Sequence, residues 1–210
     1  MPSDHINRKT AETILKAFDF AKYIGKPLNQ YAVLRLPDVT LEEAEMSFRK
    51  VRHKCRVWLQ RRQTQADMPI DRPLYVYSFE NPENGGLHVN WVVHIPEGLQ
   101  KEFRAKLFTW VKKAQGRAIE ESDIHVQDVN PFEDKTLAKY ILKGVDPAYI
   151  EYLHLQRVAK PQGPIAGRRA GASVAINKAA RDRVNFVPRH HRHTWQHSPW
   201  AQRYRQAAAQ

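Results

Sequence analysis

The stretch that most restricts the fold is residues 74–95, LYVYSFENPENGGLHVNWVVHI, which is typical of two strands joined by a turn. In the second strand the odd positions are all apolar, namely Leu87, Val89, Trp91, Val93 and Ile95. The even positions hold His88, Asn90 and His94 together with Val92. Because successive side chains of a strand point to opposite faces, one face is expected to build the core and the other to present polar groups.

The segment between the two strands, Asn81-Pro82-Glu83-Asn84-Gly85-Gly86, consists of turn-forming residues. A hairpin at this point would bring Glu80, at the end of the first strand, next to His88 in the second. A carboxylate, an imidazole and the amide carbonyl of Asn90 would then converge. This donor set suits Mg²⁺ or Mn²⁺ better than a metal that prefers thiolates. His94 lies on the same face but two strand steps beyond Asn90, too far to be a good third ligand.

The rest of the chain predicts an α+β fold. Strands are expected near residues 31–36, 74–80, 87–95 and 124–129, and amphipathic helices near residues 10–22, 41–62, 103–114 and 134–144. Thr40 and Glu43 form a capping box ahead of the second helix. We expect a central antiparallel sheet of about five strands with the helices packed on one face.

The helix that follows Thr40 is rich in basic residues outside its apolar face. These are Arg49, Lys50, Arg52, Lys54, Arg56, Arg61 and Arg62. Two interpretations are open, a solvated charged surface and a track for the backbone of DNA. The first is the more common explanation for a charged helix face, and we favour it on sequence alone.

The order Glu80, seven residues, His88-Val89-Asn90 resembles the metal-binding motif of the HUH endonucleases, in the variant where an amide replaces the second histidine. The segment Tyr140-Ile141-Leu142-Lys143 resembles the nucleophile motif of the same family, a helical tyrosine followed three residues later by lysine. The resemblance covers about residues 28–145 and implies a sheet like those of HUH and RRM domains. The segment at residues 163–183 resembles small replication proteins of bacterial plasmids or phages.

This resemblance implies a metal-dependent, site-specific nickase and ligase of single-stranded DNA that starts rolling-circle replication. Tyr140 would be the nucleophile, assisted by Lys143, while Glu80, His88 and Asn90 would hold Mg²⁺ or Mn²⁺. The substrate would be single-stranded or hairpin DNA at a replication origin. Because the chain has no GxxxxGK[ST] string, unwinding would require a separate helicase, and extension a host polymerase.

Three alternatives remain open. A conjugative relaxase or a transposase would share the chemistry, and a module that binds single-stranded nucleic acid without cutting it would share the sheet. Tyr149 and Tyr152 are alternative or second nucleophiles, because some HUH enzymes use two tyrosines.

The charge of the chain favours a polyanionic partner, since 34 Lys and Arg face 22 Asp and Glu, a net charge of +12. The sequence predicts an endonuclease-like domain at residues 1–158 and a basic extension rich in Gly, Pro, His and Arg at 159–210. Most of the excess positive charge lies in the extension. The expected DNA contacts are Arg35 in the first strand and Arg168, Arg169, Lys178, Arg181 and Arg183 in the extension.

The sequence contains neither an apolar run long enough to span a membrane nor the apolar segment of a secretory signal. Its single cysteine, Cys55, cannot form an intramolecular disulfide. We therefore expect no membrane partner and a location in the cytoplasm of a bacterial host cell.

Overall fold

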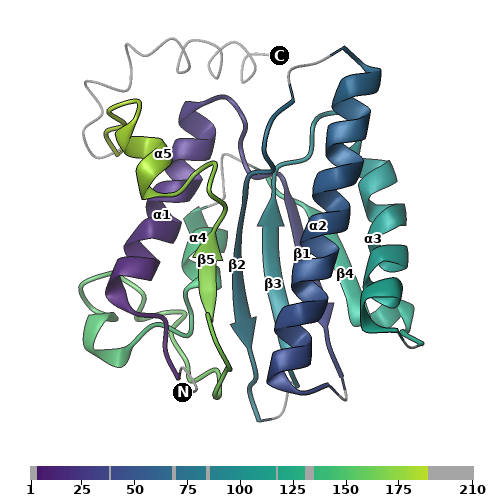
Figure 1. Cartoon of the computed structure of the whole chain (residues 1–210). Helices are drawn as coiled ribbons and strands as arrows, with labels where there is room; N and C mark the ends of the chain where they lie inside the picture. Colours follow the sequence, from purple (N-terminus) through teal and green to yellow (C-terminus); the bar gives the residue numbers. More distant parts are fainter. Residues whose placement is uncertain are drawn as a thin grey trace.

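The hairpin predicted from residues 74–95 lies at the middle of the structure. The computed structural model describes residues 4–37, 39–67, 70–83, 86–116, 118–130 and 135–188. Its sheet contains β1 (Gln30–Arg35), β2 (Tyr75–Glu80), β3 (His88–Val93), β4 (Ile124–Asp128) and β5 (Ala170–Ala172) in the order β4-β1-β3-β2-β5, with every neighbouring pair antiparallel (Figure 1). The prediction of an α+β fold around a five-stranded antiparallel sheet is confirmed.

One face of the sheet carries the apolar odd positions of β3. Two helices cover it, α2 (Leu41–Gln65) and α3 (Gln100–Gln115). The predicted capping box starts α2, where the Glu43 carboxylate accepts from the Thr40 amide at 2.8 Å. Phe48 of α2 packs its ring against Trp91 of β3 with centroids 5.7 Å apart, and Trp91 has no exposed surface. This layer is one of two hydrophobic cores and fixes the orientation of β3.

The opposite face is covered as well, which differs from the prediction that helices pack on one face only. It carries α1 (Arg8–Tyr23), α4 (Lys135–Ile141) and α5 (Lys178–Asp182), with short 3₁₀ turns at Glu121–Asp123 and Pro147–Tyr149 elsewhere in the chain. The physical reason is that this face is only partly polar. Val76 and Val92 are completely buried in a core that also contains Ile14 of α1 and Ile141 of α4, so the apolar half of the face needs a cover.

The predicted extension does not separate from the rest of the fold over its described part, residues 159–188. Its strand β5 pairs with β2, and Ile165 and Ile176 are buried in the two cores. The predicted boundary between residues 158 and 159 therefore divides one hydrogen-bonded sheet. The other residues of the predicted extension, 189–210, lie outside the described residues.

A loop of this returning segment is attached to the ends of β2 and α4. The Asn81 amide donates to the Gln162 carbonyl at 2.8 Å, and the Lys160 amide donates to the Lys143 carbonyl at 2.9 Å. Arg169 is buried and donates to the carbonyls of Phe79 and Gly163. The loop thus holds the backbone on either side of the residues that the sequence singled out.

No helix in the described part of the chain is long and apolar enough to cross a lipid bilayer.

The close approach of this loop to β2 can be tested at Gly163, which has φ of +63°. A Cβ atom there would lie 1.9 Å from the Asn81 carbonyl oxygen. Gly98 has φ of +82° but open space around its Cα, so Gly98→Ala is a matched control for backbone strain alone. We expect Gly163→Ala to lower the free energy of unfolding by about 2 kcal/mol more than Gly98→Ala, measured by urea denaturation. Equal losses in the two variants would contradict this packing.

Candidate functional site

The hairpin register brings Glu80 and His88 together. The two residues are direct partners across β2 and β3, and the His88 imidazole Nε2 lies 2.7 Å from Oε2 of the Glu80 carboxylate. The other ring nitrogen, Nδ1, lies 2.9 Å from the Gly86 carbonyl oxygen. Both ring nitrogens of His88 therefore face acceptor oxygens.

Lys143 connects this pair to Tyr140. Its ammonium Nζ lies 2.6 Å from Oε2 of Glu80 and donates to the Tyr140 hydroxyl at 2.9 Å. The short helix α4 and the turn after it place the two side chains on one side, because residues three apart are neighbours on a helix. Glu80 and Lys143 are buried, whereas Tyr140 is 39% exposed. The phenol is thus the part of this chain of contacts that a substrate can reach.

Asn90 is placed by a residue that the sequence analysis did not identify. The Tyr31 hydroxyl of β1 donates to Oδ1 of Asn90 at 2.5 Å, and both side chains are buried. The Tyr31 ring also meets the Tyr140 ring edge to face, with centroids 6.4 Å apart. This contact could have been predicted from the register of β1 on β3. That register places the odd residues of β1 on the face that carries the even residues of β3.

The charges within the site support one another. Burial by itself raises the pKa of Glu80, but hydrogen bonds from His88 and Lys143 outweigh it and leave this pKa below its usual value. Burial by itself lowers the pKa of Lys143, and its contacts with Glu80 and Tyr140 more than offset that, so this pKa is raised. Glu80 is therefore a carboxylate and Lys143 an ammonium at neutral pH. Burial also raises the pKa of Tyr31 above its ordinary value, so Tyr31 remains a protonated donor to Asn90.

The three predicted ligands are of chemical types that a hard divalent cation accepts, namely a carboxylate, an imidazole whose Nδ1 faces a backbone carbonyl, and an amide oxygen. In the structure, Oε2 of Glu80 pairs with Lys143 and Oδ1 of Asn90 accepts from Tyr31. The second carboxylate oxygen, Oε1 of Glu80, is buried and has no hydrogen-bond partner among the described residues, so one acceptor remains available. No group of three His, Cys, Asp or Glu side chains suited to a metal occurs in the described part of the chain. His94 bonds the Pro27 carbonyl through Nδ1 at 2.7 Å.

A groove beside Tyr140 gives access to the site. It has a volume of about 540 Å³ and lies between α4 and the β1–β4 side of the sheet. Tyr31, Val33, Gln127, Leu137 and Tyr140 are among the residues that line it. An extended strand lying in this groove would pass the Tyr140 hydroxyl.

The predicted DNA contacts separate into two groups. Arg35, Arg168, Lys178 and Arg183 are exposed, and Arg35 is the partner of His88 across β1 and β3. Arg169 and Arg181 are buried and donate to backbone carbonyls, Arg181 to that of Ile176 at 2.8 Å, so they hold the fold together and do not face a ligand. The interpretation of these two as DNA contacts is therefore corrected, because burial and carbonyl bonding account for both.

The alternative tyrosines lie in other surroundings. Tyr149 and Tyr152 are within 5.7 and 6.0 Å of the Arg8 guanidinium, measured to their ring centroids. Neither contacts Glu80 or Lys143 within the described residues. Of the three candidate nucleophiles, Tyr140 is the one hydrogen-bonded to Lys143, which in turn pairs with Glu80.

Neither a protein-family model nor a curated protein matches this chain.

The buried charges predict a strong effect of Glu80→Gln on stability. The variant would leave the Lys143 ammonium buried without its carboxylate, and loss of one partner from a buried pair costs about 3–5 kcal/mol. The control is Glu102→Gln, which breaks the more exposed ion pair with Arg62 and should cost far less. Urea denaturation measures both. Similar losses in the two variants would mean that Glu80 is not an internal counter-ion.

Proposed function

We propose that the protein is a metal-dependent, site-specific nickase and ligase of single-stranded DNA that initiates rolling-circle replication. The observation that carries this proposal is the continuous set of contacts from Tyr140 through Lys143 and Glu80 to His88, with distances of 2.9, 2.6 and 2.7 Å. These residues come from a helix and two strands, and the reactive hydroxyl is at the exposed end. An ion pair that only stabilises the fold would not need an exposed tyrosine hydrogen-bonded to its lysine, so the position of Tyr140 favours a reactive role.

In the proposed reaction, the Tyr140 oxygen attacks the scissile phosphorus and a bond from phosphorus to tyrosine forms as the bond to the 3′ oxygen breaks. The phenol loses its proton to solvent, and the departing 3′ oxygen gains one. Lys143 stabilises the tyrosinate, because it is an ammonium that already donates to this oxygen. Tyr31 positions Asn90 and the Tyr140 ring. A divalent cation held by Glu80, His88 and Asn90 would supply polarisation of the phosphate.

The products suit replication. The 5′-phosphotyrosine link conserves the energy of the broken bond, so the free 3′-hydroxyl can attack it and rejoin the strand. The same 3′-hydroxyl can prime a host polymerase, with a separate helicase unwinding the duplex. The expected substrate is single-stranded or hairpin DNA at an origin, and the expected location is the cytoplasm of a bacterial host. A relaxase or a transposase would use the same residues, whereas a non-catalytic binding module would form no covalent link.

Tyr140→Phe provides the direct test, because it removes the hydroxyl and keeps the ring. We expect no nicking and no covalent adduct, with single-strand affinity and thermal unfolding unchanged, because the ring can still pack on Tyr31. The measurement is a denaturing gel of protein incubated with candidate origin strands and Mn²⁺, followed by mapping of phosphotyrosine. Tyr149→Phe and Tyr152→Phe are the controls and should retain the adduct. If no tyrosine carries DNA in the wild type, the proposal fails.

Lys143 is expected to lower the barrier without forming the bond. Lys143→Met removes the donor to the Tyr140 oxygen and should slow nicking by about 10²-fold, the usual effect of losing one donor to a developing negative charge. Lys143→Arg keeps the positive charge and should recover part of the rate. Single-turnover kinetics at saturating DNA measure the effect, with thermal unfolding checked in parallel. Equal rates in Lys143→Met and wild type would exclude this role.

A further inference from the structure

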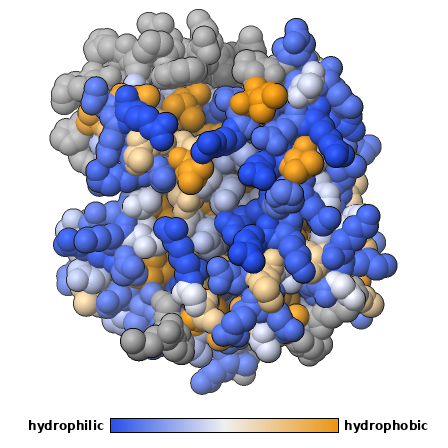
Figure 2. Space-filling view, viewed as in Figure 1, coloured by the Kyte–Doolittle hydropathy of each residue, from blue (hydrophilic) through white to orange (hydrophobic). Residues whose placement is uncertain are grey.

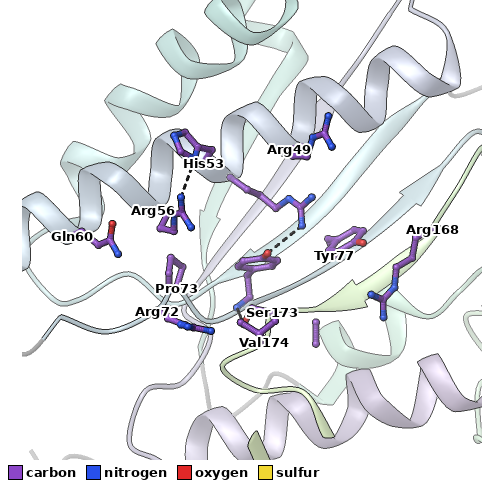
Figure 3. A pocket seen from close by; sticks show the side chains of 13 residues that line it. Arg49, His53, Arg56, Gln60, Arg72, Pro73, Tyr77, Arg168, Ser173 and Val174 are labelled. Carbon is purple, nitrogen blue, oxygen red and sulfur yellow. Dashed lines mark hydrogen bonds between the residues drawn. The ribbon is translucent and has the colours of Figure 1, made fainter. Parts of the chain in front are cut away.

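A second groove lies on the other face of the sheet, between α2 and the β2–β5 edge. It has a volume of about 690 Å³. Its helix side is formed by Arg49, Arg52, His53, Arg56 and Gln60, and its other side includes Arg72, Tyr75, Tyr77, Arg168 and Ser173. Figure 3 shows the α2 side chains along one side and Arg168 on the opposite side. The surface where α2 passes β2 and β5 is largely hydrophilic (Figure 2).

The arginines of this groove form no ion pair with a carboxylate in the described residues, unlike three arginines elsewhere in the chain. The described chain pairs Arg8 with Glu12, Arg62 with Glu102 and Arg104 with Asp128. None of the five groove arginines, Arg49, Arg52, Arg56, Arg72 and Arg168, forms an ion pair with a carboxylate in the described residues, and no carboxylate is among the lining side chains. Like charges gathered in one groove repel one another. A polyanionic ligand would relieve that repulsion.

The spacing of these cations fits a chain of anionic groups. Arg49, Arg52, Arg56 and Gln60 recur every three or four residues, so they lie along one face of α2 about one helical turn, ~5.4 Å, apart. Arg52 is fixed at the base of the groove, since its guanidinium lies 4.7 Å from the Phe48 ring centroid and donates to the Tyr75 hydroxyl at 3.1 Å. Arg49 and Arg56 remain exposed. Arg56 is also hydrogen-bonded to His53, at 3.1 Å (Figure 3). The groove thus combines one preoriented cation with exposed cations that can contact successive phosphates.

Tyr75 adds an aromatic side chain to this row. It is half-buried, beside Arg52. Basic side chains that follow a backbone, combined with aromatic rings on which bases stack, are the usual features of sites for single-stranded nucleic acid. An acidic peptide would find the charge but would make no use of the ring.

We propose that this groove is a second binding site for single-stranded nucleic acid, distinct from the Tyr140 site and contacting the phosphates through Arg49, Arg52, Arg56, Arg72 and Arg168. It lies on the face covered by α2, whereas Glu80, His88 and Tyr140 lie on the opposite face. A strand could therefore occupy it without blocking the tyrosine. Binding here does not depend on nicking, so the site stands whether or not Tyr140 is a nucleophile.

The test compares two double variants of α2 in a Tyr140→Phe background. Arg49→Ala with Arg56→Ala removes two groove cations, and Lys50→Ala with Arg61→Ala removes two exposed cations outside the groove. The probe is a fluorescein-labelled oligothymidylate titrated at several salt concentrations. The groove variant should bind more weakly by on the order of tenfold, and its salt slope should fall in magnitude by about 1.4, since each single-strand phosphate contact contributes about 0.7. The control variant should stay close to the parent.

Three outcomes would overturn the proposal. Equal losses in the two variants would mean that only the overall charge matters. Displacement of the probe by polyglutamate as effectively as by unlabelled oligothymidylate, at equal charge, would assign the groove to acidic proteins. Displacement by thymidine monophosphate at equal phosphate concentration would assign it to free nucleotides. Thermal unfolding of both variants is expected to match the parent, because these exposed side chains belong to neither hydrophobic core.

Discussion

The burial of the Glu80 carboxylate is the constraint on which the candidate site depends. A carboxylate with 1% exposure is costly to remove from water unless cations and donors surround it. His88 supplies one contact from the neighbouring strand, and Lys143 supplies another from the end of α4. This requirement couples the hairpin to a helix far along the chain. It also brings Tyr140 over the sheet, because Tyr140 and Lys143 are three residues apart.

The segment that returns after residue 159 supports the same arrangement from behind. The Gln162 carbonyl accepts from the Asn81 amide next to Glu80, and the Lys160 amide donates to the carbonyl of Lys143 itself. Arg169, buried beneath this loop, donates to the Phe79 carbonyl one residue before Glu80. The backbone beside both charged residues is therefore fixed by one loop. Its basic residues serve two purposes, with Arg169 inside the fold and Arg168 at the second groove.

The alternation and helical spacing of residues in the sequence were sufficient to predict features that depend on residues close together in the chain. The alternation of residues 87–95 predicts the buried Trp91 and the side on which His88 lies, and the spacing of Tyr140 and Lys143 predicts their contact at the C-terminal end of α4. What it did not predict depends on register and on distant pairing. Tyr31 meets Asn90 only because of how β1 aligns with β3, and β5 joins β2 across about ninety residues of chain, as in the pair Ser78 and Ala170. The Gly- and Pro-rich composition around β5 predicts a loop, and a three-residue strand leaves little periodicity to detect.

The amide at position 90 changes which residue must balance the charge of Glu80. An imidazole there could be protonated and share the negative charge, but an amide stays neutral. Asn90 is instead held by Tyr31, whose pKa is raised by burial, so this pair contributes hydrogen bonding without net charge. The positive charge beside Glu80 then comes from the Lys143 ammonium, while His88 contributes a hydrogen bond. Lys143 also donates to the Tyr140 hydroxyl. In the proposed reaction, the ammonium that offsets the buried carboxylate would also stabilise negative charge on the phenol oxygen, so that the stability and the proposed reactivity of the site would be coupled through one group.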